Sequence, residues 1–178
     1  MSIIVVEGID RVGKTTLVNA IRNWFEYDPY AYFRVFKHDG EMFNYDAMDN
    51  ANETDKMYQL IEMAELCGGN VIFDRFHLSE FVYGICNRNY RFSQAYDNML
   101  LIDSILEKYH SVLVYAKPTS LEWSSAQHGS SLYKHNMLMD AAFNDSTMKK
   151  ISTDFNTICD ETKCDSLLRD IRDLLTEV

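Results

Sequence analysis

The sequence has almost no proline and no long apolar segment. Only two prolines and seven glycines occur among its 178 residues, and no Pro-, Gly- or Ser-rich stretch divides the chain. Because flexible linkers depend on such stretches, we expect a single domain over residues 1–178 rather than several linked modules. The apolar runs are far shorter than the roughly 20 residues that cross a bilayer, so neither a membrane span nor a signal segment is expected.

Cysteine is also scarce, and its spacing is uninformative for metals. Cys67, Cys86, Cys159 and Cys164 form neither a C-x-x-C pair nor another spacing of metal ligands. Cys67 and Cys86 stand in apolar surroundings, where a cysteine behaves as a small buried apolar residue. We therefore expect no disulfides and a reducing, cytoplasmic compartment.

Basic side chains are outnumbered by acidic ones. The chain carries 17 Lys and Arg against 27 Asp and Glu, a formal net charge of −10. Nucleic acids and anionic membranes demand a basic surface, so neither is expected as a partner. In so acidic a chain, a site for a polyanion must be locally basic. Lys and Arg residues close to a glycine-rich loop are therefore candidates for such a site.

What the chain does contain is an alternation of strand and helix patterns. Hydrophobic residues make up 47% and aromatic residues 13%, enough for a sizeable core. Short apolar runs predict strands at 3–6, 31–36, 70–74, 111–116 and 155–159. Helical spacing predicts helices at 16–25, 53–67, 77–86, 93–109 (capped by Ser93), 132–149 and from a cap at Asp165 onward. This order predicts an α/β fold, with helices on both faces of a five-stranded parallel sheet.

Two polar segments interrupt this order, at 37–52 and 120–134. The first is a candidate substrate loop and the second a short lid. In a parallel sheet, ligands bind at the carboxyl ends of the strands, where these segments are expected to lie.

The most specific motif lies between the first strand and the first helix. Residues 8–15 match G-x-x-x-x-G-K-[ST] without a mismatch. Glycines let backbone N–H groups approach phosphate oxygens, and the following helix adds its positive end. Strand, glycine loop and helix together predict a P-loop NTPase fold that binds ATP. The residues expected to bind ATP are Gly8, Ile9, Asp10, Arg11, Val12, Gly13, Lys14, Thr15 and Thr16.

Several of these residues have chemistry that suits phosphoryl transfer. Lys14 would reach the β- and γ-phosphates, and the Thr15 hydroxyl would hold Mg²⁺. Arg11 would stabilise charge on the transferring group, unless it is merely an exposed loop residue. A carboxylate beside triphosphate is unusual, so Asp10 either accepts a hydroxyl hydrogen bond from a second substrate or only forms the turn.

A second charged pair, Asp74 and Arg75, follows the strand at 70–74. Asp74 could support Mg²⁺ through water, which would place it with Arg11 and Lys14 among the catalytic residues, and Arg75 could grip a phosphate with its two-pronged guanidinium. The alternative is a structural ion pair or a helix cap. Proximity to a phosphate loop favours the functional interpretation.

Residues 7–16 resemble the phosphate loop of thymidylate kinases, E-G-x-D-x-x-G-K-[ST], and residues 74–84 resemble the D-R-[YF]-x-x-S segment of that family. The resemblance extends over most of the chain but is sharp only in these two motifs. It implies transfer of the γ-phosphoryl group of ATP to a deoxynucleoside monophosphate, with Asp10 contacting the sugar 3′-hydroxyl. The acceptor site that it implies consists of Asp10, Lys37, Arg75, Ser79 and Tyr83. The family is often dimeric, so a homodimer is a further implication.

The chain departs from this family in ways that leave the acceptor base open. Arg11 stands in the phosphate loop and the lid lacks arginine, as in the eukaryotic-type enzymes. After the second strand, however, Lys37 stands where the family has a phosphate-binding Arg. A single ammonium group would then replace a guanidinium that can bind a phosphate through two N–H groups. The helix at 53–67 contains no Arg to read a thymine. The acceptor is therefore dTMP or a related or modified pyrimidine nucleotide.

Three other interpretations remain open. A deoxynucleoside kinase shares the glycine loop but phosphorylates a 5′-hydroxyl, and it typically has E-R-S where this chain has residues 74–76. A regulatory GTPase would need D-x-x-G after a strand and N-K-x-D for guanine, and residues 162–165 only mimic the second motif. An inactive nucleotide-binding protein is the third interpretation.

Overall fold

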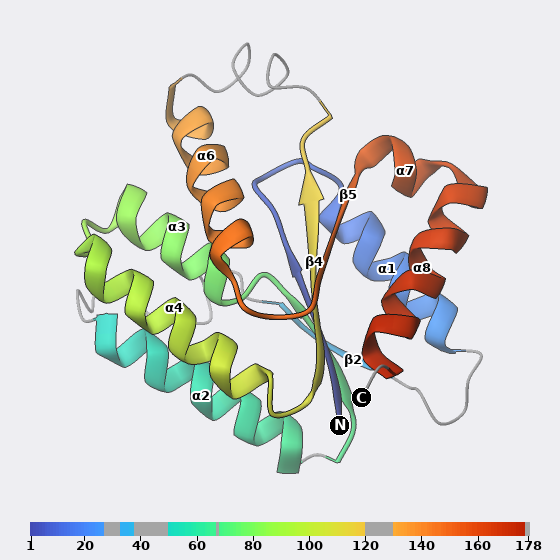
Figure 1. Ribbon diagram of the computed structural model, residues 1–178, viewed down its shortest axis with the longest axis horizontal. Helices are drawn as coiled ribbons and strands as arrows, with labels where there is room; N and C mark the ends of the chain where they lie inside the picture. The colour runs from blue at the N-terminus through green and yellow to red at the C-terminus, as the bar shows by residue number, and fades with distance from the viewer. Residues whose placement is uncertain (27–32, 38–49, 67, 120–129, 177–178) are drawn as a thin grey trace.

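The computed structural model describes residues 1–26, 33–37, 50–66, 68–119 and 130–176, and all structural statements concern these residues (Figure 1). Several predictions lie outside them in whole or in part. These are the start of the strand at 31–36, most of the polar segment at 37–52, Cys67 and the lid up to residue 129.

Five parallel strands form one sheet in the order β2-β3-β1-β4-β5. The strands are β1 (Ser2–Glu7), β2 (Phe33–Lys37), β3 (Asn70–Asp74), β4 (His110–Lys117) and β5 (Lys150–Asp154). The central strand is β1, where Ile4 is in register with Ile72 of β3 and with Val112 of β4. The predicted α/β fold with a five-stranded parallel sheet is confirmed.

Helices cover both faces of this sheet. They are α1 (Lys14–Glu26), α2 (Asn50–Leu66), α3 (His77–Asn87), α4 (Phe92–Leu106), α6 (Ser130–Asp145), α7 (Phe155–Cys159) and α8 (Glu161–Thr176). Figure 1 shows α2, α3, α4 and α6 on one side and α1, α7 and α8 on the other. Burial from both sides explains why residues 3–6 are apolar without interruption and have no exposed surface.

The last strand is the clearest error of the sequence-based assignment. Residues 155–159, predicted as a strand, form the short helix α7, and the strand β5 lies just before it. Strand β5 reads Lys-Ile-Ser-Thr-Asp and buries only Thr153, so it lacks the apolar run on which the prediction depended. Asp154 then starts the helix, because its carboxylate accepts the N–H of Thr157 at 2.8 Å.

Several helix boundaries also differ from the prediction. Helix α6 ends at Asp145 rather than 149, and the Lys150 ammonium donates to its last carbonyls, those of Phe143 and Asn144, at 2.9 and 2.7 Å. Helix α4 already includes Ser93, so this serine does not cap it. Helix α8 starts four residues before Asp165, and the Asp160 carboxylate caps it by accepting the N–H of Lys163 at 3.2 Å.

None of the described helices is long and apolar enough to cross a membrane. Of the cysteines in the described part of the chain, Cys86, Cys159 and Cys164 are free thiols.

Candidate functional site

The glycine loop joins β1 to α1 at the carboxyl edge of the sheet. Gly8 has φ +147° and Gly13 has φ +89°, values that residues with a side chain rarely adopt. A Cβ on Gly8 would lie 2.5 Å from the Ala116 carbonyl oxygen at the end of β4. A Cβ on Gly13 would lie 2.6 Å from the ring of Phe155. The loop therefore fits closely between β4 and the start of α7, and only glycine permits this.

Between the two glycines, two side chains are buried and the two between them are exposed. Ile9 and Val12 are buried and anchor the loop, whereas Asp10 and Arg11 are exposed. Arg11 has φ +65°, a left-handed conformation that costs roughly 1 kcal/mol or more in a residue with a side chain. The fold thus holds two charged side chains on the open side of a strained loop.

Lys14 begins α1 but points back into the loop. It is only 6% exposed, and its ammonium donates a hydrogen bond to the Ile9 carbonyl. Burial, and then the neighbouring Arg75 charge, lower the pKa of Lys14 to about 8, against the opposing effect of nearby carboxylates. A buried ammonium with this low pKa would gain stability from an anion such as a phosphate. Thr15 and Thr16 follow in the first turn of α1 and are exposed.

Asp74 ends β3 beside this lysine. It is in register with Val6 of β1 and with Lys37 of β2, so its carboxyl group lies at the same edge of the sheet. Burial raises the pKa of Asp74, and the charges of Lys14, Arg75 and Lys37 only partly oppose this effect. A buried carboxylate in this situation would gain from a bound cation.

Asp74 and Thr15 carry oxygen atoms of the kind that a magnesium ion takes as ligands. Mg²⁺ takes oxygen ligands and is commonly held by one or two protein groups together with substrate phosphates. No group of three or more His, Cys, Asp or Glu side chains in the described ranges could hold a metal by itself. A magnesium site made of these two residues alone would therefore need phosphate oxygens from a nucleotide.

Arg75 links the glycine loop to α3. Its guanidinium forms an ion pair with Asp10 and donates to the Tyr83 hydroxyl at 3.0 Å. The Tyr83 hydroxyl lies 3.4 Å from the second Asp10 oxygen and closes the triangle. Burial alone would raise the pKa of Asp10, but the charge and hydrogen bond of Arg75, together with smaller contributions from Lys14 and Tyr83, lower it. Three residues from two distant parts of the sequence thus converge at one point, which we call the Asp10–Arg75–Tyr83 triad.

Two other predicted acceptor residues lie differently. Ser79 is only 2% exposed, and its hydroxyl donates to Glu7. In this structure the hydroxyl is turned into the protein, and the predicted contact of Ser79 with an acceptor stays a prediction. Lys37 is exposed at the end of the edge strand β2, where its charge lowers the pKa of Asp74 against the larger effect of burial.

Sequence reasoning missed three residues at this edge. Glu7, the last residue of β1, is fully buried and bonds to the start of α3. His135 of α6 packs its ring 5.0 Å from that of Tyr83 and lies 3.2 Å from the Asn87 amide oxygen. Phe155, against Gly13, is 44% exposed. Only Glu7 had a sequence signal, its place directly before Gly8.

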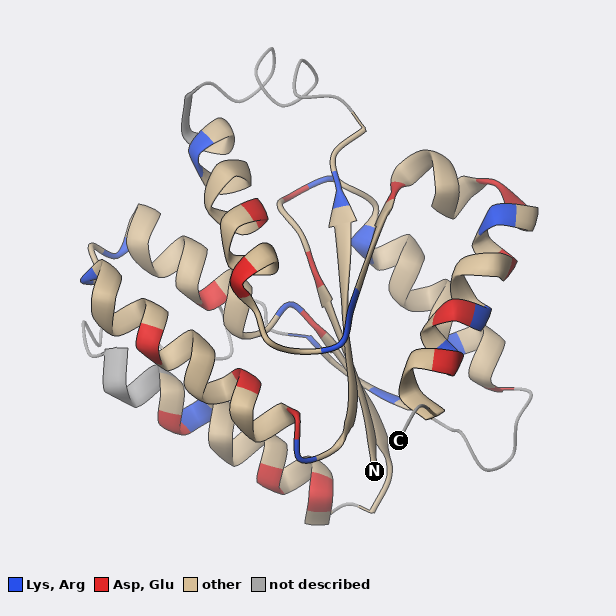
Figure 2. Ribbon diagram, in the orientation of Figure 1, with Lys and Arg blue, Asp and Glu red and all other residues tan. Residues whose placement is uncertain are grey.

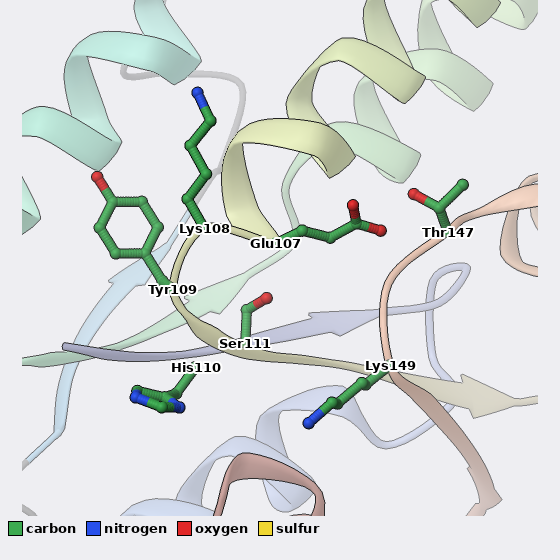
Figure 3. A pocket seen from close by; sticks show the side chains of 7 residues that line it. All are labelled: Glu107, Lys108, Tyr109, His110, Ser111, Thr147 and Lys149. Atoms are coloured by element: carbon green, nitrogen blue, oxygen red, sulfur yellow. The ribbon is translucent and has the colours of Figure 1, made fainter. Parts of the chain in front are cut away.

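The opposite edge of the sheet holds a pocket of about 420 Å³, shown in Figure 3. Glu107, Lys108, Tyr109, His110, Ser111, Thr147 and Lys149 line it. The Lys149 ammonium donates to the Leu174 carbonyl at 3.3 Å, and the Tyr109 hydroxyl donates to Glu65 at 2.9 Å. In Figure 3 the Lys108 and Lys149 side chains point in opposite directions. These groups do not converge, so the carboxyl edge is the better candidate site.

The charge distribution agrees with this choice. Figure 2 shows acidic residues spread along α2, α4 and α8, away from the glycine loop. Basic residues appear at the carboxyl end of β4 and the start of α1. In a chain with net charge −10, these basic side chains make the carboxyl edge the better candidate for a polyanion site.

Comparisons with known proteins agree with the fold. No protein-family model and no curated protein matches the sequence. The structure is similar to that of the YorR protein of Bacillus subtilis in complex with phosphorylated GDP, with a TM-score of 0.66, 16% identity, and coverage of 97% of this chain and 95% of that one. It is also similar to thymidylate kinase of Ehrlichia chaffeensis, with a TM-score of 0.61, 14% identity, and coverage of 98% and 99%. At such identities the similarity shows the fold, and together with the glycine loop and the strand order it establishes that this chain has a P-loop NTPase core.

Proposed function

We propose that this protein is a nucleoside monophosphate kinase, which transfers the γ-phosphoryl group of ATP to a deoxynucleoside 5′-monophosphate. The observation that carries the proposal is the Asp10–Arg75–Tyr83 triad. It places an anion-binding guanidinium in direct contact with the loop that would hold the donor phosphates. Two phosphate-binding groups side by side are what in-line transfer between two nucleotides needs.

On the donor side, the loop amides and Lys14 would hold the β- and γ-phosphates of ATP. Thr15 and Asp74 would hold Mg²⁺, which neutralises charge on the phosphates when it is bound. The half-exposed ring of Phe155, packed on Gly13, offers an apolar face to the adenine. Arg11, exposed on the strained loop, would stabilise the charge that develops on the transferring group.

On the acceptor side, Arg75 would bind the 5′-phosphate, with Lys37 adding a more distant positive charge. A guanidinium has five N–H donors, so Arg75 can keep its bonds to Asp10 and Tyr83 and still donate to a phosphate. Asp10 would then accept a hydrogen bond from the acceptor sugar. We propose dTMP or a related pyrimidine nucleotide as acceptor, on the resemblance of residues 7–16 and 74–84 to thymidylate kinases.

A second candidate is a deoxynucleoside kinase. The Asp10 side chain is 56% exposed and Arg75 lowers its pKa, so the carboxylate is ionised at neutral pH. It is thus able to accept a proton from a sugar 5′-hydroxyl. In that case Arg75 would bind donor phosphates rather than an acceptor phosphate.

A coupled assay of ADP release separates these candidates. The purified protein is given ATP and Mg²⁺ with each deoxynucleoside and each 5′-monophosphate, modified pyrimidines included. We expect turnover with monophosphates alone, and the preferred base would name the enzyme. Turnover with nucleosides alone would support the second candidate, and no turnover with any acceptor would refute both.

A further inference from the structure

The buried carboxylate of Glu7 bonds to the start of a helix that lies about seventy residues further along the chain. One of its oxygens accepts the backbone N–H groups of Phe76, Leu78 and Ser79, at 2.9, 3.1 and 3.2 Å. The other oxygen accepts the Ser79 hydroxyl. Glu7 has no exposed surface and precedes Gly8 directly.

Helix α3 has no cap of its own. The residue before it, Phe76, makes no capping hydrogen bond with its side chain. The first N–H groups of a helix have no partner within the helix, and leaving one buried and unpaired costs about 1–3 kcal/mol. Glu7 pairs three backbone N–H groups at once, and its negative charge suits the positive end of the helix.

We propose that Glu7 is a positioning residue that sets the acceptor side of the site against the donor side. This inference rests on the proposed kinase function. Phe76 follows Arg75 directly, and α3 carries Tyr83, so the bonds to Glu7 fix both members of the triad that come from this part of the chain. In the chain, Glu7 directly precedes the glycine loop, which carries Asp10. One rigid carboxylate thus sets the separation of the two phosphate sites.

The same contact decides which group can bind an acceptor phosphate. A helix N-terminus is a ready site for a phosphate, but in α3 the Glu7 carboxylate already fills it. The acceptor anion must therefore rely on the Arg75 side chain. This makes the orientation of Arg75, and hence Glu7, decisive for acceptor use.

Three substitutions at this position separate geometry from charge. Glu7→Gln keeps an oxygen for the three backbone N–H groups and offers an amide N–H to the Ser79 hydroxyl. Glu7→Ala removes all four bonds. Glu7→Asp keeps the charge but is one methylene shorter and cannot reach all three N–H groups. Ser104→Ala, which removes one serine hydrogen bond within α4 and leaves Glu7 untouched, is the control.

The full-length variants would be compared by steady-state kinetics with ATP and dTMP and by titration with ATP alone. We expect Glu7→Ala to lower kcat/KM for dTMP by about 100-fold while ATP affinity changes less than about threefold, since small displacements of a bound substrate cost about this much. Glu7→Gln should recover most of the activity, and Ser104→Ala should stay within about threefold of the wild type. If Glu7→Ala does not fold, Glu7→Asp should show the same selective loss for dTMP.

Two kinetic outcomes would overturn the proposal. One is a parallel loss of ATP affinity and dTMP use, which would mean that Glu7 merely supports the glycine loop. The other is a Glu7→Gln variant as impaired as Glu7→Ala. Amide hydrogen exchange over residues 74–84 supplies a readout without catalysis. Faster exchange there in Glu7→Ala, with unchanged exchange over α8, would uphold the positioning role even if the wild type phosphorylated no acceptor, whereas unchanged exchange over 74–84 would refute it.

Discussion

The carboxyl and amino edges of the sheet are formed by the same strands and helices. Their charged side chains differ in burial, in hydrogen bonding and in backbone conformation. At the carboxyl edge, a lysine and an aspartate are buried, and Arg11 and Arg75 both have positive φ. At the amino edge, Lys149 and Tyr109 have ordinary hydrogen-bond partners, and the polar side chains around the pocket diverge. Buried charge and backbone strain cost stability, and a protein keeps them where they act. The comparison favours the glycine loop as the functional site.

The largest effect is expected from Arg11→Ala. Because Arg11 would stabilise charge that exists only during transfer, kcat should fall by about 1,000-fold while both KM values stay nearly constant. Steady-state kinetics with ATP and dTMP would measure this. Arg172→Ala, at an exposed arginine of α8, is the control. A loss confined to the KM for ATP would contradict the role in the transition state.

Arg75→Ala should act on the acceptor rather than the donor. Losing a charge-assisted hydrogen bond costs about 1.5–3 kcal/mol, so the dissociation constant for dTMP should rise roughly 10- to 100-fold. Calorimetric titration with dTMP and, separately, with ATP would show the difference. Lys149→Ala, in the pocket at the amino edge, should change neither constant. Equal losses for dTMP and ATP in Arg75→Ala would favour the deoxynucleoside kinase.

Gly8→Ala tests whether the loop needs its unusual backbone. The added Cβ would lie 2.5 Å from the Ala116 carbonyl oxygen at φ +147°, so the free energy of unfolding should fall by about 1–3 kcal/mol. Denaturant titration would measure the change. Gly69→Ala is the matched control, because a Cβ there meets nothing within 4 Å. Equal stability of the two variants would mean that Gly8 is not held closely against the end of β4.

The smallest effect concerns pH. A bound triphosphate would favour the charged form of Lys14, whose pKa in the free protein is about 8, so ATP binding should take up a proton above that pH. ATP affinity should therefore fall as pH rises from about 7.5 to 9.5, by at most roughly tenfold per pH unit. Lys14→Arg remains protonated over this range and should give a flatter profile in the same titrations. An equally steep profile would assign the proton to another group.

The sequence predicts the donor half of the candidate site better than the acceptor half. All residues of the glycine loop are contiguous, so one motif names them, and the charged pair after β3 is recognisable because it ends an apolar run. The contacts of Glu7 with α3 span about seventy residues, and the packing of Tyr83 on His135 joins two helices. A local sequence pattern cannot predict contacts between residues that lie so far apart in the chain. The bond between the Ser79 hydroxyl and Glu7 is of the same kind.

The fold shows a similar division. The central strands are buried on both sides, and their apolar runs identify them. Strand β5 lies at the edge and carries Lys, Ser, Thr and Asp. Its strand conformation therefore depends on pairing with β4 and not on an apolar composition. The helix at 155–159 was mistaken for a strand because five residues are too few to show a helical period.

The central claim is that the glycine loop and the Asp10–Arg75–Tyr83 triad take part in the same reaction. The most direct measurement follows γ-labelled ATP, with Mg²⁺ and dTMP or the pyrimidine monophosphate that the acceptor panel prefers, in the wild type and in Arg75→Ala. We predict label in the nucleoside diphosphate for the wild type, and strongly reduced label in the variant that recovers as the acceptor concentration is raised. Label in inorganic phosphate alone, or equal transfer by both proteins, would contradict the account.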